Sequence, residues 1–230
     1  MTASRIPDVR RNYPRVSPEL VKEAATLPAA ILADVYGRRG TVSGRIAALA
    51  PTMKVAGPAL TVEVRPGDNL MIHAALAIAQ PGDVIIVDGK ADQTCALIGE
   101  IMTSQAAAIG VAGYVIDAAV RDVEALRAMN FPVFSYGYNP AGPTKRIPGR
   151  VNHPISIGGI TVNPGDLVVG DADGVVVIER ERVAEMIELG RKKVADERKR
   201  LDGIARREQL TPGWFKGALD EAGIVMEDAQ

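Results

Sequence analysis

The middle of the chain alternates short apolar runs with amphipathic stretches. The apolar runs are typical of buried strands and are bounded by Pro-Gly or Asp-Gly turns; they lie at 59–64, 84–87, 113–117 and 132–136. The stretches between them have helical periodicity and lie at 68–79, 94–109 and 122–129. This alternation predicts an α/β fold whose chemistry lies in the loops at the carboxyl ends of the strands.

The segments before and after this core differ from it in residue pattern and composition. Residues 16–50 are predicted to be helical, with Ser17 as N-cap, Pro18 at the first helical position and an acid, Glu19, in the first turn. A loop rich in Pro, Gly and basic residues is expected at 139–152, and short strands joined by tight Gly turns at 155–178. The chain is therefore divided into an N-terminal helical segment (1–50), a core domain (51–180) and a C-terminal helical extension (181–230).

A long helix is predicted from about Glu181 to Arg207. Its apolar positions have heptad-like spacing that predicts one buried face: Val183, Ile187, Gly190, Val194, Leu201 and Ile204. Glu197 falls on the same face, so a carboxylate sits where the pattern indicates burial. The remaining positions are rich in both acids and bases, which favours a solvated face over a surface for nucleic acid.

The amino-acid composition limits which catalytic and metal-binding mechanisms are open to the protein. The 230 residues are 47% apolar and 24% charged with a net charge of −1, which is typical of a globular protein and argues against one that works by holding nucleic acid. One cysteine and two histidines exclude an internal disulfide and a thiolate zinc cluster, and they disfavour Ser-His-Asp or Cys-His catalysis. Any metal is expected to be a hard, oxygen-ligated cation, Mg²⁺ or Mn²⁺.

No targeting or membrane segment is visible in the sequence. The first twenty residues lack the apolar run of a secretory signal, and no stretch has the roughly 18 apolar residues of a membrane span. We therefore expect a cytoplasmic protein without a membrane partner.

The strongest candidate for chemistry is the pair Arg121-Asp122, where a strand feeds a helix. A helix N-terminus attracts anions, Arg121 could clamp a carboxylate with two hydrogen bonds, and Asp122 could bind a divalent cation. Asp122 could equally be a simple N-cap, and Arg121 a surface ion pair. Glu100, on the preceding helix, could hold a water or act as a base, or be an ordinary surface glutamate.

Other reactive residues give weaker signals. His73 and His153 are more typical of structural or solvated histidines, and Cys95, at an expected helix start, could have a lowered pKa but has no adjacent histidine. Lys54, Lys90 and Lys145 could each form a Schiff base, but none lies in an apolar context. No dinucleotide or P-loop motif occurs.

A set of short motifs, in a fixed order, resembles one family. They are Gly67-Asp68-Asn69-Leu70, Gly99-Glu100-Ile101, Gly110-Val111-Ala112-Gly113, Val115-Ile116-Asp117 with Val120-Arg121-Asp122, Phe131-Pro132-Val133-Phe134, and Pro164-Gly165-Asp166 through Asp171-Ala172-Asp173-Gly174. Over residues 30–205 the chain looks like the class II pyruvate aldolases that cleave 4-hydroxy-4-methyl-2-oxoglutarate and 4-carboxy-4-hydroxy-2-oxoadipate. That group shares its fold with the regulator of ribonuclease activity A.

The resemblance implies a swivelling β/β/α fold, a homotrimer or homohexamer, and an active site at the subunit interface. It implies that Asp122 binds Mg²⁺ or Mn²⁺ and that Arg121 binds the pyruvyl part of a 2-oxo acid substrate. Glu100 would act through metal-bound water, the backbone N–H groups around Ile101 and Met102, next to Gly99, would help to hold the pyruvate, and Glu197 would reach a neighbouring subunit's site.

Two readings of function follow. The first is a metal-dependent aldolase that releases pyruvate and also decarboxylates oxaloacetate. The second is a non-catalytic regulator that binds ribonuclease E, against which the long C-terminal helix argues. The chain departs from the aldolase pattern at Ala118, Ala119 and Ile98 and in the segment around Trp214. These departures bear on the identity of the substrate more than on the binding of a metal.

Overall fold

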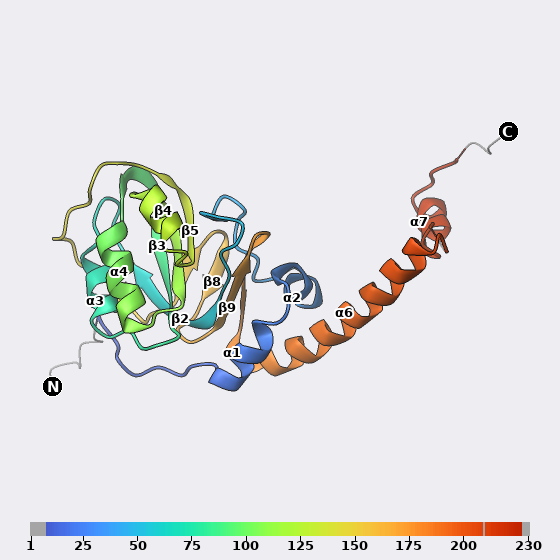
Figure 1. The fold of residues 1–230 in the computed structure, drawn as a ribbon, viewed down its shortest axis with the longest axis horizontal. Coiled ribbons are helices and arrows are strands. Elements are labelled where there is room, and N and C mark those ends of the chain that lie inside the picture. The colour runs from blue at the N-terminus through green and yellow to red at the C-terminus, as the bar shows by residue number, and fades with distance from the viewer. Residues whose placement is uncertain (1–7, 209, 227–230) are drawn as a thin grey trace, which may run out of the picture. The chain divides into compact units, whose positions relative to one another are not determined.

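A computed structural model describes residues 8–208 and 210–226. It divides into two compact units, Met1–Gly190 and Arg191–Gln230. Figure 1 shows that the first unit holds the sheet and the helices that cover it. None of the helices in the described part of the chain is long and apolar enough to cross a membrane.

The first unit is built on a mixed sheet in which β1, β5, β4, β3, β2, β9 and β10 lie side by side in that order, with β6 pairing with β2. The four central strands, β2 (Val55–Glu63), β3 (Val84–Ala96), β4 (Gly113–Val120) and β5 (Val133–Tyr138), run parallel. The antiparallel members are β1 (Ala47–Ala48), β6 (Arg150–Val151), β9 (Leu167–Asp171) and β10 (Gly174–Ile178). A separate hairpin joins β7 (Ile155–Ile157) to β8 (Ile160–Val162).

Helices connect the parallel strands, because successive parallel strands need a crossover connection. They are α3 (Leu70–Leu76), α4 (Glu100–Ile109) and α5 (Val123–Ala128). The N-terminal helices are α1 (Pro18–Ala24) and α2 (Ala29–Val35). A short 3-10 turn, η1 (Arg180–Arg182), precedes the long α6 (Val183–Ala205), and α7 (Phe215–Glu221) follows in the second unit.

The sheet is buried on both faces, which is why its strands read as nearly continuous apolar runs. On one face Leu60, Ile85 and Ile116 pack against α3, α4 and α5. On the other face Ile86 and Phe134 pack against β7–β10. A third cluster covers the outer side of β9 and β10 with residues of α1, α2 and the start of α6. The expected α/β fold, with N-terminal helices and a long C-terminal helix, is confirmed.

The predicted helix over 16–50 is wrong beyond residue 35. Ser17 does cap α1, because its Oγ accepts a hydrogen bond from Leu20 N at 3.3 Å. Pro28 then separates α1 from α2, and Gly37 and Gly40 take positive φ angles that end the helical run. The rest of the segment is turns and the short β1.

The predicted helix over 94–109 begins six residues later than expected. Residues 94–96 belong to β3, whose pairing with β4 continues past an irregularity at 88–92. Lys90 and Ala91 both have positive φ angles there, so the chain kinks and then returns to the sheet. The Asp88-Gly89 pair therefore marks a bulge rather than a strand end.

The apolar stripe of α6 divides into two parts. Val183, Ile187 and Gly190 are buried in the third core cluster or against it. Val194, Leu201 and Ile204 are exposed, Leu201 by 65%. The prediction of a buried face is therefore confirmed up to Gly190 and wrong for Val194, Leu201 and Ile204.

Candidate active site

The Arg121-Asp122 pair lies where β4 ends. Its backbone connects this loop to the loop that precedes α4. Arg121 N donates to Ile98 O at 3.0 Å, and Asp122 has a φ angle of +58° that turns the chain sharply into α5. Asp122 occupies the N-cap position of α5, as one interpretation expects, but its side chain makes no capping hydrogen bond to that helix. Instead its Oδ2 accepts a hydrogen bond from Glu100 N at 3.0 Å, at the start of α4. A carboxylate at that position is favoured by the helix dipole.

Gly99 makes this arrangement possible. A Cβ atom at residue 99 would lie 2.3 Å from Asp122 Oδ2 and 2.9 Å from Arg121 Cγ. No side chain fits there unless both functional side chains move. The glycine immediately before α4 is therefore a steric requirement of the Arg-Asp pair rather than a turn residue.

A cavity of about 150 Å³ opens beside the pair. It lies at the carboxyl ends of β3 and β4, the edge of a parallel sheet where ligands usually bind. Its lining brings together four predicted site residues, Gly99, Ile101, Met102 and Arg121. The further lining residues are Asn69, His73, Ala96, Leu97, Ile98, Pro143 and Lys145.

The site is open to solvent on the side of the charged pair. The side chains of Arg121 and Asp122 are 40% and 42% exposed, and Arg121 Nε lies 3.7 Å from Asp122 Oδ2. Glu100 is exposed at the first residue of α4. The first N–H groups of a helix have no acceptor inside it, so those of Ile101 and Met102 are suited to an anion. The roles of these residues remain predictions.

The remaining wall of the cavity brings together Asn69 and two of the weaker sequence candidates, His73 and Lys145. Asn69 and His73 come from the start and middle of α3, and Lys145 from the loop 139–149 that follows β5. Burial, and then the positive charge of Lys145, lower the pKa of His73, so its ring is neutral near pH 7. The sequence signal for this wall is the motif Gly67-Asp68-Asn69, which belongs to the family resemblance; the burial of its two polar residues is visible only in the structure.

Asp68 holds the loop in place. This residue is 1% exposed, and its carboxylate accepts hydrogen bonds from Thr144 Oγ1 at 2.7 Å and from the backbone N of Arg146 and Ile147 at 2.7 and 3.1 Å. Burial by itself would raise the pKa of Asp68, but these hydrogen bonds, with one from Leu70 N, outweigh it and lower the pKa. The loop is therefore fixed against α3, with Lys145 between two anchored residues.

The oxygen donors at the site suit a magnesium-like cation. Among residues 8–208 and 210–226, no cluster of three His, Cys, Asp or Glu side chains could enclose a metal. Mg²⁺, however, is often held by one or two carboxylates together with water and substrate oxygens. Asp122, fixed by Glu100 N and half exposed, fits this mode, and Glu100, at the first residue of α4, is a second carboxylate of the same site.

Glu197 lies in the second unit, on the part of α6 whose apolar positions are exposed. Its side chain is 51% exposed, and Oε1 lies 3.7 Å from Lys193 Nζ. Its predicted place in a neighbouring subunit's site remains a prediction.

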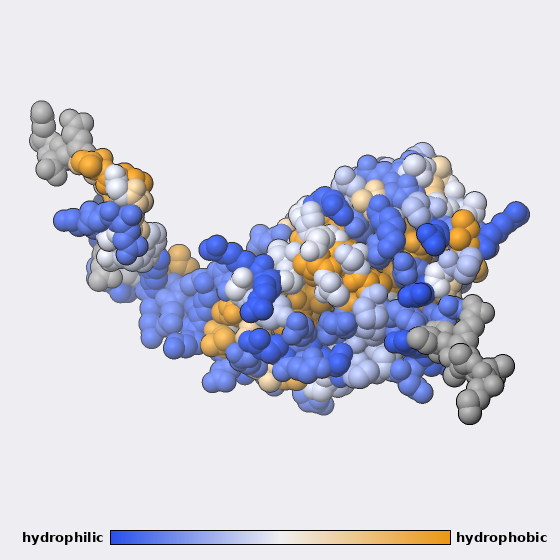
Figure 2. All heavy atoms as spheres, turned by 180° about the vertical axis from the view of Figure 1, so that it is seen from behind, coloured by the Kyte–Doolittle hydropathy of each residue, from blue (hydrophilic) through white to orange (hydrophobic). Residues whose placement is uncertain are grey.

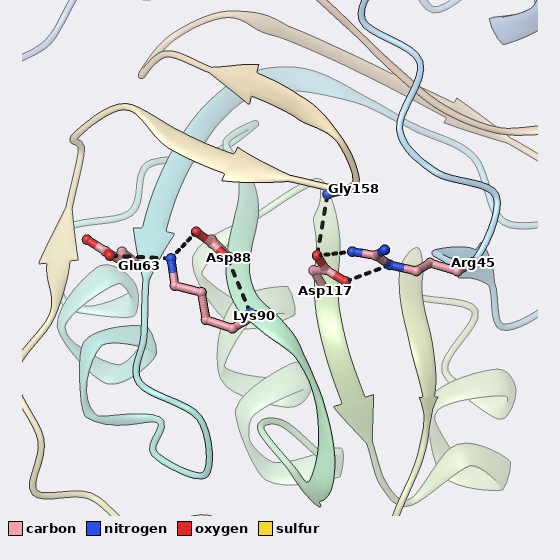
Figure 3. Close-up of polar contacts among 6 residues, drawn as sticks. All are labelled: Arg45, Glu63, Asp88, Lys90, Asp117 and Gly158. Carbon is pink, nitrogen blue, oxygen red and sulfur yellow. Dashed lines mark hydrogen bonds and ion pairs between the residues drawn. The ribbon is translucent and has the colours of Figure 1, made fainter.

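A second group of polar side chains lies on the sheet, outside the lining of the cavity, and has a structural role (Figure 3). Lys90 points between Asp88 and Glu63, and Arg45 forms a two-bonded pair with Asp117 at 2.8 and 3.2 Å. Burial would lower the pKa of Lys90, but the two carboxylates outweigh it and raise the pKa, which disfavours a Schiff-base role.

Three other sequence candidates also lie outside the cavity. Cys95 is at the end of β3, where burial raises the pKa of its thiol, so the prediction of a lowered pKa is wrong. His153 is buried between β6 and β7, and its carbonyl accepts from Thr61 Oγ1. Lys54 lines a separate pocket beside β9.

The fold and the site define a class: α/β proteins that present an Arg-Asp pair beside a helix N-terminus, at the carboxyl edge of a parallel sheet. Residues 20–177 match the family model described as RraA-like, Aldolase/RraA. The chain belongs to this family, as its motifs indicate.

Individual relatives agree with this assignment. A Halalkalibacterium halodurans protein named "Putative 4-hydroxy-4-methyl-2-oxoglutarate aldolase" is 40% identical over 187 residues, covering 81% of this chain and 89% of the relative. The crystal structure of an uncharacterized Pseudomonas syringae protein superposes with a TM-score of 0.75 at 30% identity, covering 84% and 96% of the two chains. Streptomyces coelicolor RraAS2, described as an unusual member of the RNase ES inhibitor RraA family, superposes with a TM-score of 0.73 at 26% identity, covering 85% and 99%.

Proposed function

We propose that this protein is a divalent-metal-dependent aldolase that cleaves a 4-hydroxy-2-oxo acid to pyruvate and a second oxo acid. The observation that carries the proposal is the packing of Arg121 and Asp122 against Gly99 at the start of α4, beside a cavity. The similarity to the Halalkalibacterium protein supports a substrate of the 4-hydroxy-4-methyl-2-oxoglutarate type. The motif resemblance adds the 4-carboxy-4-hydroxy-2-oxoadipate type.

The chain's own groups account for binding and orientation. Arg121 clamps the 2-oxo carboxylate with two parallel hydrogen bonds, and the N–H groups of Ile101 and Met102 donate to the same end of the substrate. Gly99 leaves room for this approach. The substrate is thereby held with its C3–C4 bond next to Glu100 and Asp122.

Cleavage requires a base and a place for the electron pair. A water held by Glu100 or Glu197 takes the proton from the 4-hydroxyl and passes one of its own to that carboxylate. The C4–O bond becomes a carbonyl, and the C3–C4 electron pair forms the enolate of pyruvate. Protonation at C3 then gives pyruvate. Mg²⁺ or Mn²⁺, held by Asp122, would supply the Lewis acidity that stabilises the enolate charge.

Decarboxylation of oxaloacetate is expected as a side activity. Loss of CO₂ from oxaloacetate leaves the same pyruvate enolate, so groups that stabilise one reaction stabilise the other.

A homotrimer or homohexamer with the site at the subunit interface is part of the proposal. Its support is exposed apolar surface: Val194, Leu201 and Ile204 on α6, and an apolar area on the face of the first unit in Figure 2. Glu197 lies on the same helix and would then complete the site of a neighbour.

The test is a panel of 4-hydroxy-2-oxo acids with Mg²⁺ or Mn²⁺, in which lactate dehydrogenase reports pyruvate. Release of pyruvate that Arg121→Ala abolishes is the expected result. Absence of pyruvate with every substrate, or full activity in Arg121→Ala, would overturn the proposal.

The second candidate function is a non-catalytic regulator that binds ribonuclease E, and the similarity to RraAS2 favours it. A regulator would need no fixed Arg-Asp pair beside a cavity. Retention of this protein on immobilised ribonuclease E, together with no pyruvate release, would favour the regulator over the aldolase.

A further inference from the structure

The second unit contains a hollow of its own at the end of α6. Its volume is about 700 Å³, which is in the range of ligand pockets. All of its lining residues lie between 199 and 214, within the unit Arg191–Gln230. The segment around Trp214 is also where the chain departs from the aldolase pattern, and the proposed function gives that segment no role.

A reversal of the chain forms the hollow. α6 ends in a tight turn, in which Arg207 has a φ angle of +60° and Glu208 N donates to Gly203 O at 2.8 Å. A Pro-Gly pair at 212–213 then leads into α7. Residues 211–214 thereby line the same hollow as the last two turns of α6.

The charged side chains around the hollow leave a net charge of +2. Lys199, Arg200 and Arg206 are its cations, and Glu208 is the carboxylate among its described lining residues. Arg206 engages Glu208 through two hydrogen bonds at 3.2 and 3.1 Å. Lys199 Nζ lies 4.0 Å from Asp196 Oδ1, at the limit of an ion pair, and Arg200 makes no ion pair with another described residue. Two cations are therefore left for a ligand.

Trp214 supplies a flat aromatic wall beside these cations. Its side chain is 65% exposed. Phe215 contacts the indole edge-on, with ring centroids 6.4 Å apart and an interplanar angle of 73°. No guanidinium of residues 8–208 and 210–226 lies over the indole. An exposed indole next to available cations is suited to stacking with the ring of an anionic ligand.

These features together favour a ring that is joined to a doubly charged anion. A neutral ring would use only the indole, and an inorganic anion only the cations. The carboxyl end of α6 carries partial negative charge, so Lys199 and Arg200, and not backbone groups, hold the anion. A carboxylate brings one negative charge, whereas a phosphate monoester brings about 1.5 to 2 at pH 7. An aromatic ring tethered to a phosphate therefore matches both the charge and the indole.

We propose that the hollow at the end of α6 is a binding site for a nucleoside monophosphate. The base stacks on Trp214, Arg200 donates two parallel hydrogen bonds to the phosphate, and Lys199 adds a second positive charge. The site is independent of the proposed aldolase reaction. A single strand of RNA presents the same base and phosphate groups as a free nucleotide, so the test separates these two sources.

The experiment is a fluorescence titration of the full-length protein with adenosine monophosphate (AMP). Because Trp214 is the only tryptophan of the chain, its emission reports on this site. Adenosine provides the ring without the phosphate, inorganic phosphate the charge without the ring, and a short oligoadenylate the strand. Arg200→Met removes a guanidinium from the hollow, and Arg198→Met is the matched control on α6, since Arg198 does not line the hollow.

A second variant tests the stacking. Trp214→Leu lacks the fluorophore, so its affinity for AMP is measured by isothermal titration, with circular dichroism to show that the variant is folded. The same titration is carried out on the wild-type protein, so that the two methods can be compared.

We expect AMP to quench the Trp214 emission until the site is saturated, and to bind at least about 10-fold more tightly than adenosine or phosphate. Arg200→Met should weaken AMP about 10- to 100-fold, the range for hydrogen bonds to a charged group, and Arg198→Met should stay within about twofold of wild type. Trp214→Leu should weaken AMP about 5- to 150-fold, the range for a base stacked on an aromatic side chain. The oligoadenylate should bind no more tightly than AMP.

Four results would overturn the proposal. One is no binding of AMP by either method, and another is equal affinity for AMP and for adenosine or phosphate. The third is an equal loss in Arg200→Met and Arg198→Met, which would assign the effect to the general charge of the helix. The fourth is tighter binding of the oligoadenylate than of AMP, which would assign the hollow to nucleic acid instead of a free nucleotide.

Discussion

Replacing Gly99 by alanine tests the geometry of the site with one methyl group. The φ and ψ angles of Gly99 are −154° and −161°, an extended conformation that alanine adopts, so the substitution introduces no backbone strain. Its whole effect should come from the contacts of the new Cβ atom.

The size of the effect follows from the distances. The Cβ atom would lie 2.3 Å from Asp122 Oδ2, whereas ordinary contacts begin at 3.4 Å, so the carboxylate must move by about 1 Å. That movement breaks or lengthens its 3.0 Å hydrogen bond with Glu100 N and displaces Arg121. A misplacement of about 1 Å typically costs about 100-fold in rate, or roughly 2.7 kcal/mol of transition-state stabilisation.

The assay is the initial rate of pyruvate release at several substrate concentrations, with circular dichroism to show that the variant is folded. We expect kcat/KM to fall about 100-fold in Gly99→Ala. The matched control is Gly44→Ala, because a Cβ at residue 44 has no heavy atom within 4 Å. Activity of Gly99→Ala within about threefold of the control would refute the claim that the Arg-Asp pair must sit against residue 99.

Three further predictions concern stability and reactivity. Asp68→Asn should lower the free energy of unfolding by about 2 kcal/mol at pH 7 in urea titrations, because it removes a charged acceptor of loop hydrogen bonds. Since the folded pKa of Asp68 lies below its usual 3.8, this contribution is present above that pH and should be lost as the pH falls through the folded value; a difference that persists at lower pH would contradict it. Cys95 should react slowly with iodoacetamide at pH 8 in the native protein and rapidly in urea, because burial raises its pKa; equal rates by mass spectrometry would contradict this. Gly165→Ala should destabilise the protein by at least about 2 kcal/mol, because residue 165 has a φ angle of +84° and its Cβ would overlap Pro14 O; an unchanged urea midpoint would refute this.

The sequence alone predicts the parts of the structure that depend on residues close together in the chain. β4 runs to Val120, three residues beyond the predicted strand at 113–117, and α5 follows, so Arg121 and Asp122 lie between a strand and a helix as predicted. Ser17 likewise caps α1 where the pattern of Ser, Pro and Glu indicates it. These features depend on residues close together in the chain.

What the sequence could not predict depends on contacts between distant residues. The carboxylate of Asp122 accepts from Glu100 N at the start of α4 and makes no capping bond to its own helix, α5. β3 continues past the bulge at Lys90 and Ala91 because it pairs with β4 on both sides of the bulge. Local turn signals alone would predict that the strand ends there. The docking of the loop 139–149 by Asp68 is also a long-range contact, and with it the place of Lys145 in the cavity.

The most direct test of the central claim is the rate of pyruvate release from 4-hydroxy-4-methyl-2-oxoglutarate with Mg²⁺, measured for wild type, Arg121→Lys and Asp122→Asn. The account predicts release by the wild type. Arg121→Lys should lose most of the activity because lysine keeps the charge but not the two-pronged geometry, and Asp122→Asn should lose it because the carboxylate is gone. No release by the wild type with this or any other 4-hydroxy-2-oxo acid, or wild-type rates in both variants, would contradict it.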